Sequence, residues 1–253
     1  MDYINPDRGA IFWMSVAVNN PTYKRGQMEW ALWRAFTLGR SVAHGPPPIF
    51  KTRIKRLLDI DRTFEAGEFH GASPADFAFG GPVVEGTGID VAYAAVDVFC
   101  LALALDLLDV GFKQSEIVFV MRHLRKPLER WYPKIVARPS LLDRQVRLAN
   151  RYPELPAHQP AEGRAPQADA RVFLILNRIE MTELLPAAGR QPVFGAPEFC
   201  EGAASLHERL HTLMPRHRRT VIVLEVAGVA QAVSVFLQKA PVVRRGRPPR
   251  HQA

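Results

Sequence analysis

The sequence is constrained most by a long apolar segment, residues 91–110, which a second apolar segment follows after a short break. Almost every position from Val91 to Val110 is apolar, and the run is interrupted only by aspartates such as Asp97, Asp106 and Asp109. A helix that is apolar on all sides has to be buried. Residues 91–110 are therefore predicted to form a helix at the centre of a domain.

The break after this segment predicts a helical hairpin. Gly111 is the residue type that ends a helix in the left-handed conformation. Ser115 is the predicted N-cap of the next helix, and Glu116 places a carboxylate in its first turn. The second helix is predicted to end at about Arg125, before Pro127, and two more helices are expected over residues 127–137 and 139–150.

Composition suits a globular chain with one large domain or two ordinary ones, since 47% of its 253 residues are hydrophobic. The uncharged run between Asp97 and Asp106 is only eight residues, well short of the roughly 18 of a membrane span. The charged N-terminus lacks the order of a signal peptide. We therefore expect a cytoplasmic protein without membrane contact, and we interpret Cys100 and Cys200 as core thiols.

The net charge of +8 and pI near 9.9 favour an anionic partner, of which nucleic acid is the commonest. A helix predicted over residues 50–62 places apolar side chains on one side and cations on the other. The cations are Lys51, Arg53, Lys55 and Arg56, and Arg62 near the helix end completes the predicted set. A helix with this arrangement can neutralise phosphates and contact bases in a DNA major groove. The plain alternative is a solvated basic face.

The C-terminal tail is a second cluster of cations, and residues 241–253 contain no acid. It is predicted to be disordered in isolation. Its central residues are Arg244, Arg245, Gly246, Arg247 and Pro248. The Arg-Gly-Arg-Pro core resembles the AT-hook, in which glycine lets the backbone lie flat in a narrow A·T minor groove while the arginines reach along its floor. A solubilising tail is the alternative.

The order of predicted elements in residues 27–126 also resembles a known family. An amphipathic helix at about residues 27–42 precedes the basic helix, and a Gly-rich extended segment then leads to the apolar hairpin. The most specific part is Asp109-Val110-Gly111-Phe112-Lys113-Gln114-Ser115-Glu116-Ile117. Together these features resemble the DNA-binding region of MerR-like winged-helix regulators. The resemblance implies that Lys51, Arg53, Lys55 and Arg56 lie on a recognition helix and that residues 77–88 lie on a wing.

A Pro-rich linker is predicted over residues 151–169, because its composition cannot bury much surface. After it, residues 172–176 and 221–224 are apolar runs suited to buried strands, and residues 203–214 and 227–239 have helical spacing. These elements predict a small α/β unit. Three roles stay open for it: association, sensing, or the second half of one continuous core.

One motif in this unit supports a different function. The motif is His207-Glu208-Arg209-Leu210-His211. On a helix this spacing puts both imidazoles on one face, where they can bind zinc while the glutamate polarises a water. His217 follows at the interval of the third metzincin ligand, but Met214 and Pro215 stand where that family needs a glycine. We therefore predict no metal, cofactor or catalytic residue, and keep a zinc-dependent hydrolase using His207, His211 and His217 as an alternative.

These inferences predict an α+β, mostly helical protein. An arm (residues 1–26) precedes a winged-helix-like domain (27–150), the linker (151–169), the small α/β unit (170–240) and the basic tail (241–253). The predicted function is that of a DNA-binding transcriptional regulator rather than an enzyme. Double-stranded DNA is the expected partner, and a homodimer is left open. A protein interaction module whose basic surface meets acidic partners is the third hypothesis.

Overall fold

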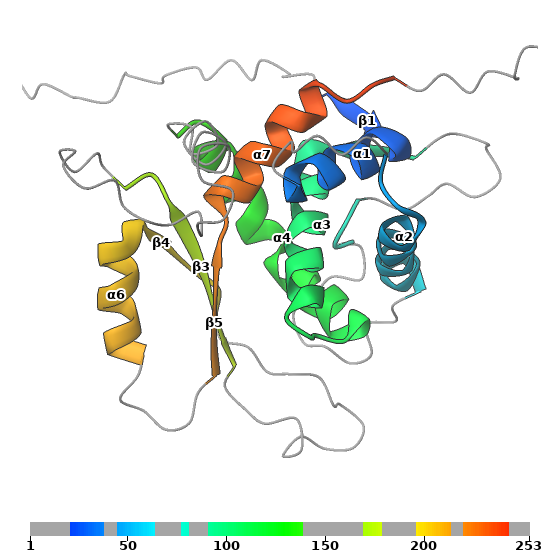
Figure 1. The fold of residues 1–253 in the computed structure, drawn as a ribbon. Coiled ribbons are helices and arrows are strands. Elements are labelled where there is room, and N and C mark those ends of the chain that lie inside the picture. Colours follow the sequence, from blue (N-terminus) through cyan, green and yellow to red (C-terminus); the bar gives the residue numbers. More distant parts are fainter. Residues whose placement is uncertain are drawn as a thin grey trace, which may run out of the picture.

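The computed structural model describes residues 21–37, 45–63, 77–80, 91–138, 169–178, 196–213 and 220–242, which form a mixed α+β fold (Figure 1). The helices are α1 (Arg25–Phe36), α2 (Pro48–Thr63), α3 (Ala95–Asp109), α4 (Gln114–Val136), α6 (Gly202–Leu213) and α7 (Ala227–Gln238). The strands are β1 (Thr22–Lys24), β2 (Ala92–Ala94), β3 (Val172–Arg178), β4 (Glu198–Glu201) and β5 (Thr220–Glu225). Of the helices in the described ranges, α6 lies on one side of the larger sheet and the others gather on the opposite side (Figure 1).

Helix α3 is the centre of the helical part, as its sequence predicts. It packs against α1, α2, α4 and α7, and every residue from Asp97 to Leu105 is buried. The start of the predicted segment differs, because residues 92–94 form the short strand β2. This strand pairs antiparallel with β1, which places the buried Tyr23 opposite the buried Tyr93. Residues 92–94 form a strand despite their helix-like apolar pattern, because they pair with β1, which lies about 70 residues earlier in the chain.

The turn between α3 and α4 confirms the predicted role of Gly111. Its φ is 97°, and the N–H groups of Gly111 and Phe112 donate to the carbonyl oxygens of Leu108 and Leu107, each at 3.1 Å. This pair of bonds is the Schellman motif. The predicted N-cap Ser115 is wrong: the cap is Lys113, whose N–H donates to the Glu116 carboxylate at 3.2 Å. A glutamate at the third helical position reaches back to the cap, which fixes the helix start two residues earlier.

Helix α4 does not end before Pro127, as predicted, but runs through both Pro127 and Pro133 to Val136. Proline inside a helix removes a backbone hydrogen bond and costs about 3 kcal/mol. The helix continues because its buried stripe continues: Leu124, Leu128 and Ile135 are all fully buried on the same side. Burying such side chains contributes roughly 1.5–3 kcal/mol each, which offsets the two prolines.

The predicted strands at residues 172–176 and 221–224 are confirmed as β3 and β5, and the predicted helices as α6 and α7. β4 was not predicted. The sheet order is β4-β3-β5, and both pairings are antiparallel. The central strand β3 is apolar from Val172 to Leu176 because it is buried on both faces, against the helical core on one and against the cluster beneath α6 on the other.

The two parts of the chain share one hydrophobic core within the described ranges. Val172, Leu174 and Leu176 of β3 belong to the same buried cluster as the helices, while Phe173 and Ile175 face the side covered by α6. This alternation follows the period of a strand. Helix α7 packs against α1, α3 and α4. Of the three roles left open for residues 170–240, the packing supports the second half of a continuous core.

Several sequence predictions fall on residues outside the described ranges. They are the arm over residues 1–20, most of the wing, the helix at 139–150, the linker up to residue 168, His217, and the tail from residue 243 onward. Among the helices that the structure does describe, none is long and apolar enough to cross a membrane.

Candidate nucleic-acid interface

Helix α2 divides its residues between a buried stripe and a cationic face. Ile54, Leu57, Leu58 and Asp61 are buried, at the spacing of one helix face. The predicted DNA-binding residues Lys51, Arg53, Lys55, Arg56 and Arg62 are all exposed. The structure therefore brings these five cations together on one helix. The other five predicted residues, Arg244 to Pro248, lie outside the described ranges.

The first turns of α2 are held by aromatic packing. Phe50 forms edge contacts with Trp33 and Phe36 of α1, with ring centroids 5.3 and 6.2 Å apart. Such aromatic pairs contribute about 0.5–1.5 kcal/mol each beyond the area that they bury. These contacts fix the end of α2 that carries Lys51 and Arg53 against the rest of the protein.

The last turn of α2 is held by a buried carboxylate, Asp61. Its oxygens accept the backbone N–H groups of Ala78 and Phe79, both at 3.1 Å, and the Nε–H of Arg122 on α4 at 2.8 Å. Arg122 also donates to the carbonyl oxygen of Asp61. A buried charge is tolerated only when it is paired and hydrogen-bonded, and Asp61 meets both conditions. Asp61 therefore joins α2, α4 and the segment 77–80.

The segment 77–80, predicted as the start of a wing, forms no strand in the structure and is anchored to the helices. Ala78 and Phe79 are buried, and Arg125 of α4 donates to the carbonyl oxygen of Ala78 at 3.3 Å. Arg125 also pairs with the buried Asp97 at 2.6 Å. Gly80 has a φ of 124° and lies against Asp97, at a position where a side chain would be strained. The segment 77–80 is therefore fixed beside α2 and α4.

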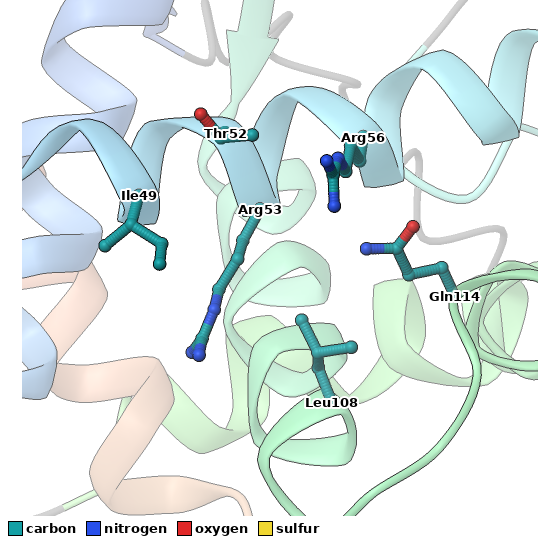
Figure 2. A pocket seen from close by; sticks show the side chains of 6 residues that line it. All are labelled: Ile49, Thr52, Arg53, Arg56, Leu108 and Gln114. Carbon is teal, nitrogen blue, oxygen red and sulfur yellow. The ribbon is translucent and has the colours of Figure 1, made fainter.

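A pocket opens between α2 and the turn that joins α3 to α4. It is lined by Ile49, Thr52, Arg53, Arg56, Leu108 and Gln114. Figure 2 shows the Arg53, Arg56 and Gln114 side chains extending into the space between the two elements. The Thr52 hydroxyl donates to the carbonyl oxygen of Pro48 on its own helix, at 2.9 Å. The polar groups that reach the pocket are therefore two guanidinium groups and one amide.

The cations of α2 differ in how they are paired. Arg53 lies 3.1 Å from the Asp109 carboxylate at the end of α3, and Arg62 lies 3.6 Å from Asp59. Both pairs are exposed, and such surface pairs contribute about 0–1 kcal/mol. Lys51, Lys55 and Arg56 form no ion pair with any residue that the structure describes. Their charges are free to meet an external anion.

A second acid, Asp106, precedes Asp109 on α3 and is half-buried. Burial, and to a smaller extent the neighbouring charge of Asp109, raises the pKa of its carboxyl group to about 7. Near neutral pH this group is therefore close to half protonated. The negative charge at this end of α3 depends on pH as a result.

The His207–His211 motif lies on α6, far from α2 in the fold (Figure 1). Both imidazoles are exposed and their rings contact edge to face, with centroids 4.6 Å apart. Arg209 between them is bound to Glu198 of β4, at 2.7 Å from Nη2 to Oε1. Across the described ranges, no three His, Cys, Asp or Glu side chains lie close enough together to hold a metal ion. The hydrolase alternative gains no support from these residues.

Sequence analysis missed three residues at this interface: Asp61, Asp109 and Gln114. A signal for Asp61 was present, because it continues the apolar spacing of Ile54, Leu57 and Leu58, and an acid at such a position has to find a buried partner. Asp109 and Gln114 reach α2 only through the packing of α3 and α4. No local pattern could have placed them there.

Comparisons with known proteins add no relative: no family model, no curated protein and no solved structure matches this chain. Function is therefore inferred from the site.

Proposed function

We propose that this chain binds double-stranded DNA through the exposed face of α2, as a transcriptional regulator of the winged-helix type. The proposal rests on one observation. Four cations, Lys51, Arg53, Lys55 and Arg56, are exposed on α2 outside its buried stripe, and three of them form no ion pair with any described residue. A cluster of exposed cations on a rigidly held helix favours a polyanionic partner.

The dimensions of α2 support a major-groove position. Its 16 residues correspond to a length of roughly 24 Å, and a helix with its side chains is about 10–12 Å across. The major groove of B-DNA is about 12 Å wide and admits such a helix. In this arrangement Arg53 and Arg56 contact base edges or phosphates, and Lys51 and Lys55 neutralise phosphates along the groove walls.

The proposal includes two further elements. Residues 77–88 would act as the wing, starting from the fixed point at Ala78 and Phe79. The basic tail would add A·T-dependent contacts in the minor groove through Arg244, Arg245 and Arg247. The protein would then hold DNA by one rigid element and one flexible element.

The test is fluorescence anisotropy with a labelled duplex, repeated over a range of salt concentrations. Arg53→Gln combined with Arg56→Gln should weaken binding and reduce the slope of log K against log salt by about two. The matched control combines Arg130→Gln on α4 and Lys239→Gln at the C-cap of α7, which removes two exposed cations elsewhere instead. If both pairs weaken binding equally, the protein has only a generally basic surface and the proposal fails.

The interaction-module hypothesis is separated by the same experiment. Absence of duplex binding by the wild-type protein at low salt would favour that hypothesis over DNA.

A further inference from the structure

We propose that the pocket between α2 and the α3–α4 turn binds one phosphate group, and that Asp109 is the resident anion which this phosphate displaces from Arg53. The inference rests on the proposed function, because it assigns one contact of the DNA-binding surface. In addition, the Asp109 carboxylate of the protein itself competes with the phosphate for Arg53.

The side chains in the pocket match the chemistry of a phosphate. Arg56 of α2 and Gln114 at the start of α4 point toward one another in the pocket, and Arg53 extends past Leu108 along its other side (Figure 2). Guanidinium groups bind phosphate oxygens in a bidentate manner, and an amide nitrogen adds a further donor. Leu108 forms an apolar wall. These donors come from two different elements, so they can surround an anion rather than meet it from one side.

Asp109 already provides an anion for one of these donors, Arg53. Its carboxylate lies 3.1 Å from the Arg53 guanidinium, with the two side chains 64% and 48% exposed. A pair this exposed contributes about 0–1 kcal/mol, so breaking it costs little. Asp109 is also the last residue of α3, where the helix dipole disfavours a negative charge.

A phosphate would be the stronger partner for this pocket. A phosphate offers more acceptor oxygens than a carboxylate, so it can accept from Arg56 and Gln114 and also from Arg53 once that side chain leaves Asp109, with which the structure pairs it. Arg56 has no ion-pair partner among the described residues, so it gains a partner without losing one. Arg53 therefore exchanges Asp109 for phosphate, and Asp109 is left in solvent.

The first experiment removes the competitor. Asp109→Asn should tighten binding of a labelled duplex by up to about five-fold, which corresponds to a surface pair of about 1 kcal/mol. The slope of log K against log salt should also become steeper in this variant. Arg53 can then neutralise a DNA phosphate without first giving up its pair with the Asp109 carboxylate. Asp59→Asn is the matched control, since it removes an exposed acid that pairs with another arginine of α2, Arg62, at 3.6 Å. Its effect should be smaller.

The second step shows whether Asp109 acts through Arg53. In an Arg53→Gln background, Asp109→Asn should change duplex affinity no more than Asp59→Asn does. If instead Asp109→Asn and Asp59→Asn have equal effects in the wild-type background, Asp109 contributes only its charge and the pocket proposal is overturned. The proposed function would stand in that case, because wild-type duplex binding would remain. Both acids are exposed, and circular dichroism confirms that the variants fold.

The last experiment tests the pocket without DNA. Inorganic phosphate is titrated into the full-length protein, and the side-chain amide signal of Gln114 is followed by NMR. A shift that disappears in the Arg53→Gln variant supports the pocket. If that shift occurs while the wild-type protein binds no duplex, the proposed function fails and the pocket takes free phosphate instead. If neither duplex binding nor a shift is found, both proposals are overturned.

Discussion

The Asp61 cluster should be the most sensitive polar site in the described part of the protein. The Asp61→Ala variant removes a carboxylate that is 3% exposed and leaves its partner Arg122, 7% exposed, without that carboxylate. It also removes the acceptor of two backbone N–H groups, those of Ala78 and Phe79. The change therefore removes the carboxylate that faces one buried cation and accepts from two buried backbone donors.

The expected cost follows from these losses. Removing one partner of a buried ion pair typically costs about 3–5 kcal/mol, and each unsatisfied buried donor adds about 1–3 kcal/mol. These two costs are not fully additive, because a relaxation that lets water reach Arg122 also lets water reach the two backbone N–H groups. We expect the free energy of unfolding to fall by about 4–5 kcal/mol, a large share of the roughly 5–15 kcal/mol of a typical protein.

Urea denaturation at pH 7, followed by circular dichroism, measures this change. Asp59→Ala on the same helix is the control, because its pair with Arg62 is exposed and should contribute at most about 1 kcal/mol. The double variant Asp61→Ala/Arg122→Met should be more stable than the sum of the single changes predicts, since no buried cation remains. The reasoning is refuted if Asp61→Ala costs no more than Asp59→Ala, or if the two changes at Asp61 and Arg122 are additive.

Three further results are expected. The pKa of Asp106 is about 7 in the folded state against an ordinary 3.8. Between these two pH values the native state binds more protons than the unfolded state, so the free energy of unfolding falls as pH rises from about 4 to about 7. The Asp106→Asn variant should lack this pH dependence and should melt at a higher temperature than the wild type above pH 7, with no difference near pH 4. Gly111→Ala should cost roughly 1–2 kcal/mol in thermal unfolding, because its φ is 97°; no loss would argue against the left-handed turn. Deleting residues 243–253 should weaken binding to an A·T-rich duplex by about 1 kcal/mol while leaving the preferred site unchanged, whereas equal weakening on a G·C-rich duplex would reduce the tail to a nonspecific cation cluster.

The elements that could be predicted from sequence are those whose pattern is local and strong. Helix α3 has apolar residues on all sides, and α2 has a clean division between apolar and cationic positions. Each pattern fits only one kind of element and one kind of environment. The turn at Gly111 was predictable for the same reason, because few residues other than glycine adopt its conformation.

The features that could not be predicted depend on packing between distant segments. Helix α4 passes through Pro127 because its buried side chains continue on the same face, and a local rule about proline cannot weigh that gain. The pairing of Tyr23 with Tyr93 joins two three-residue strands that have no partner nearby in the sequence. At the start of α4 the prediction was wrong by only two residues. Glu116 was placed correctly in the first turn, but the N-cap whose N–H it accepts is Lys113 and not Ser115.

The same packing supports the DNA-binding role that we propose for α2. Buried and exposed positions follow one another closely along this helix. Ile54 and Leu57 pack in the core, and Lys55 and Arg56, which lie between them in the sequence, are exposed. The helix is held at its start by Phe50 and at its end by Asp61. Side chains that project from a helix fixed at both ends lose little backbone entropy on binding, which leaves more of the contact energy for affinity. A variant that loosens either end should therefore weaken DNA binding even though it leaves every cation in place.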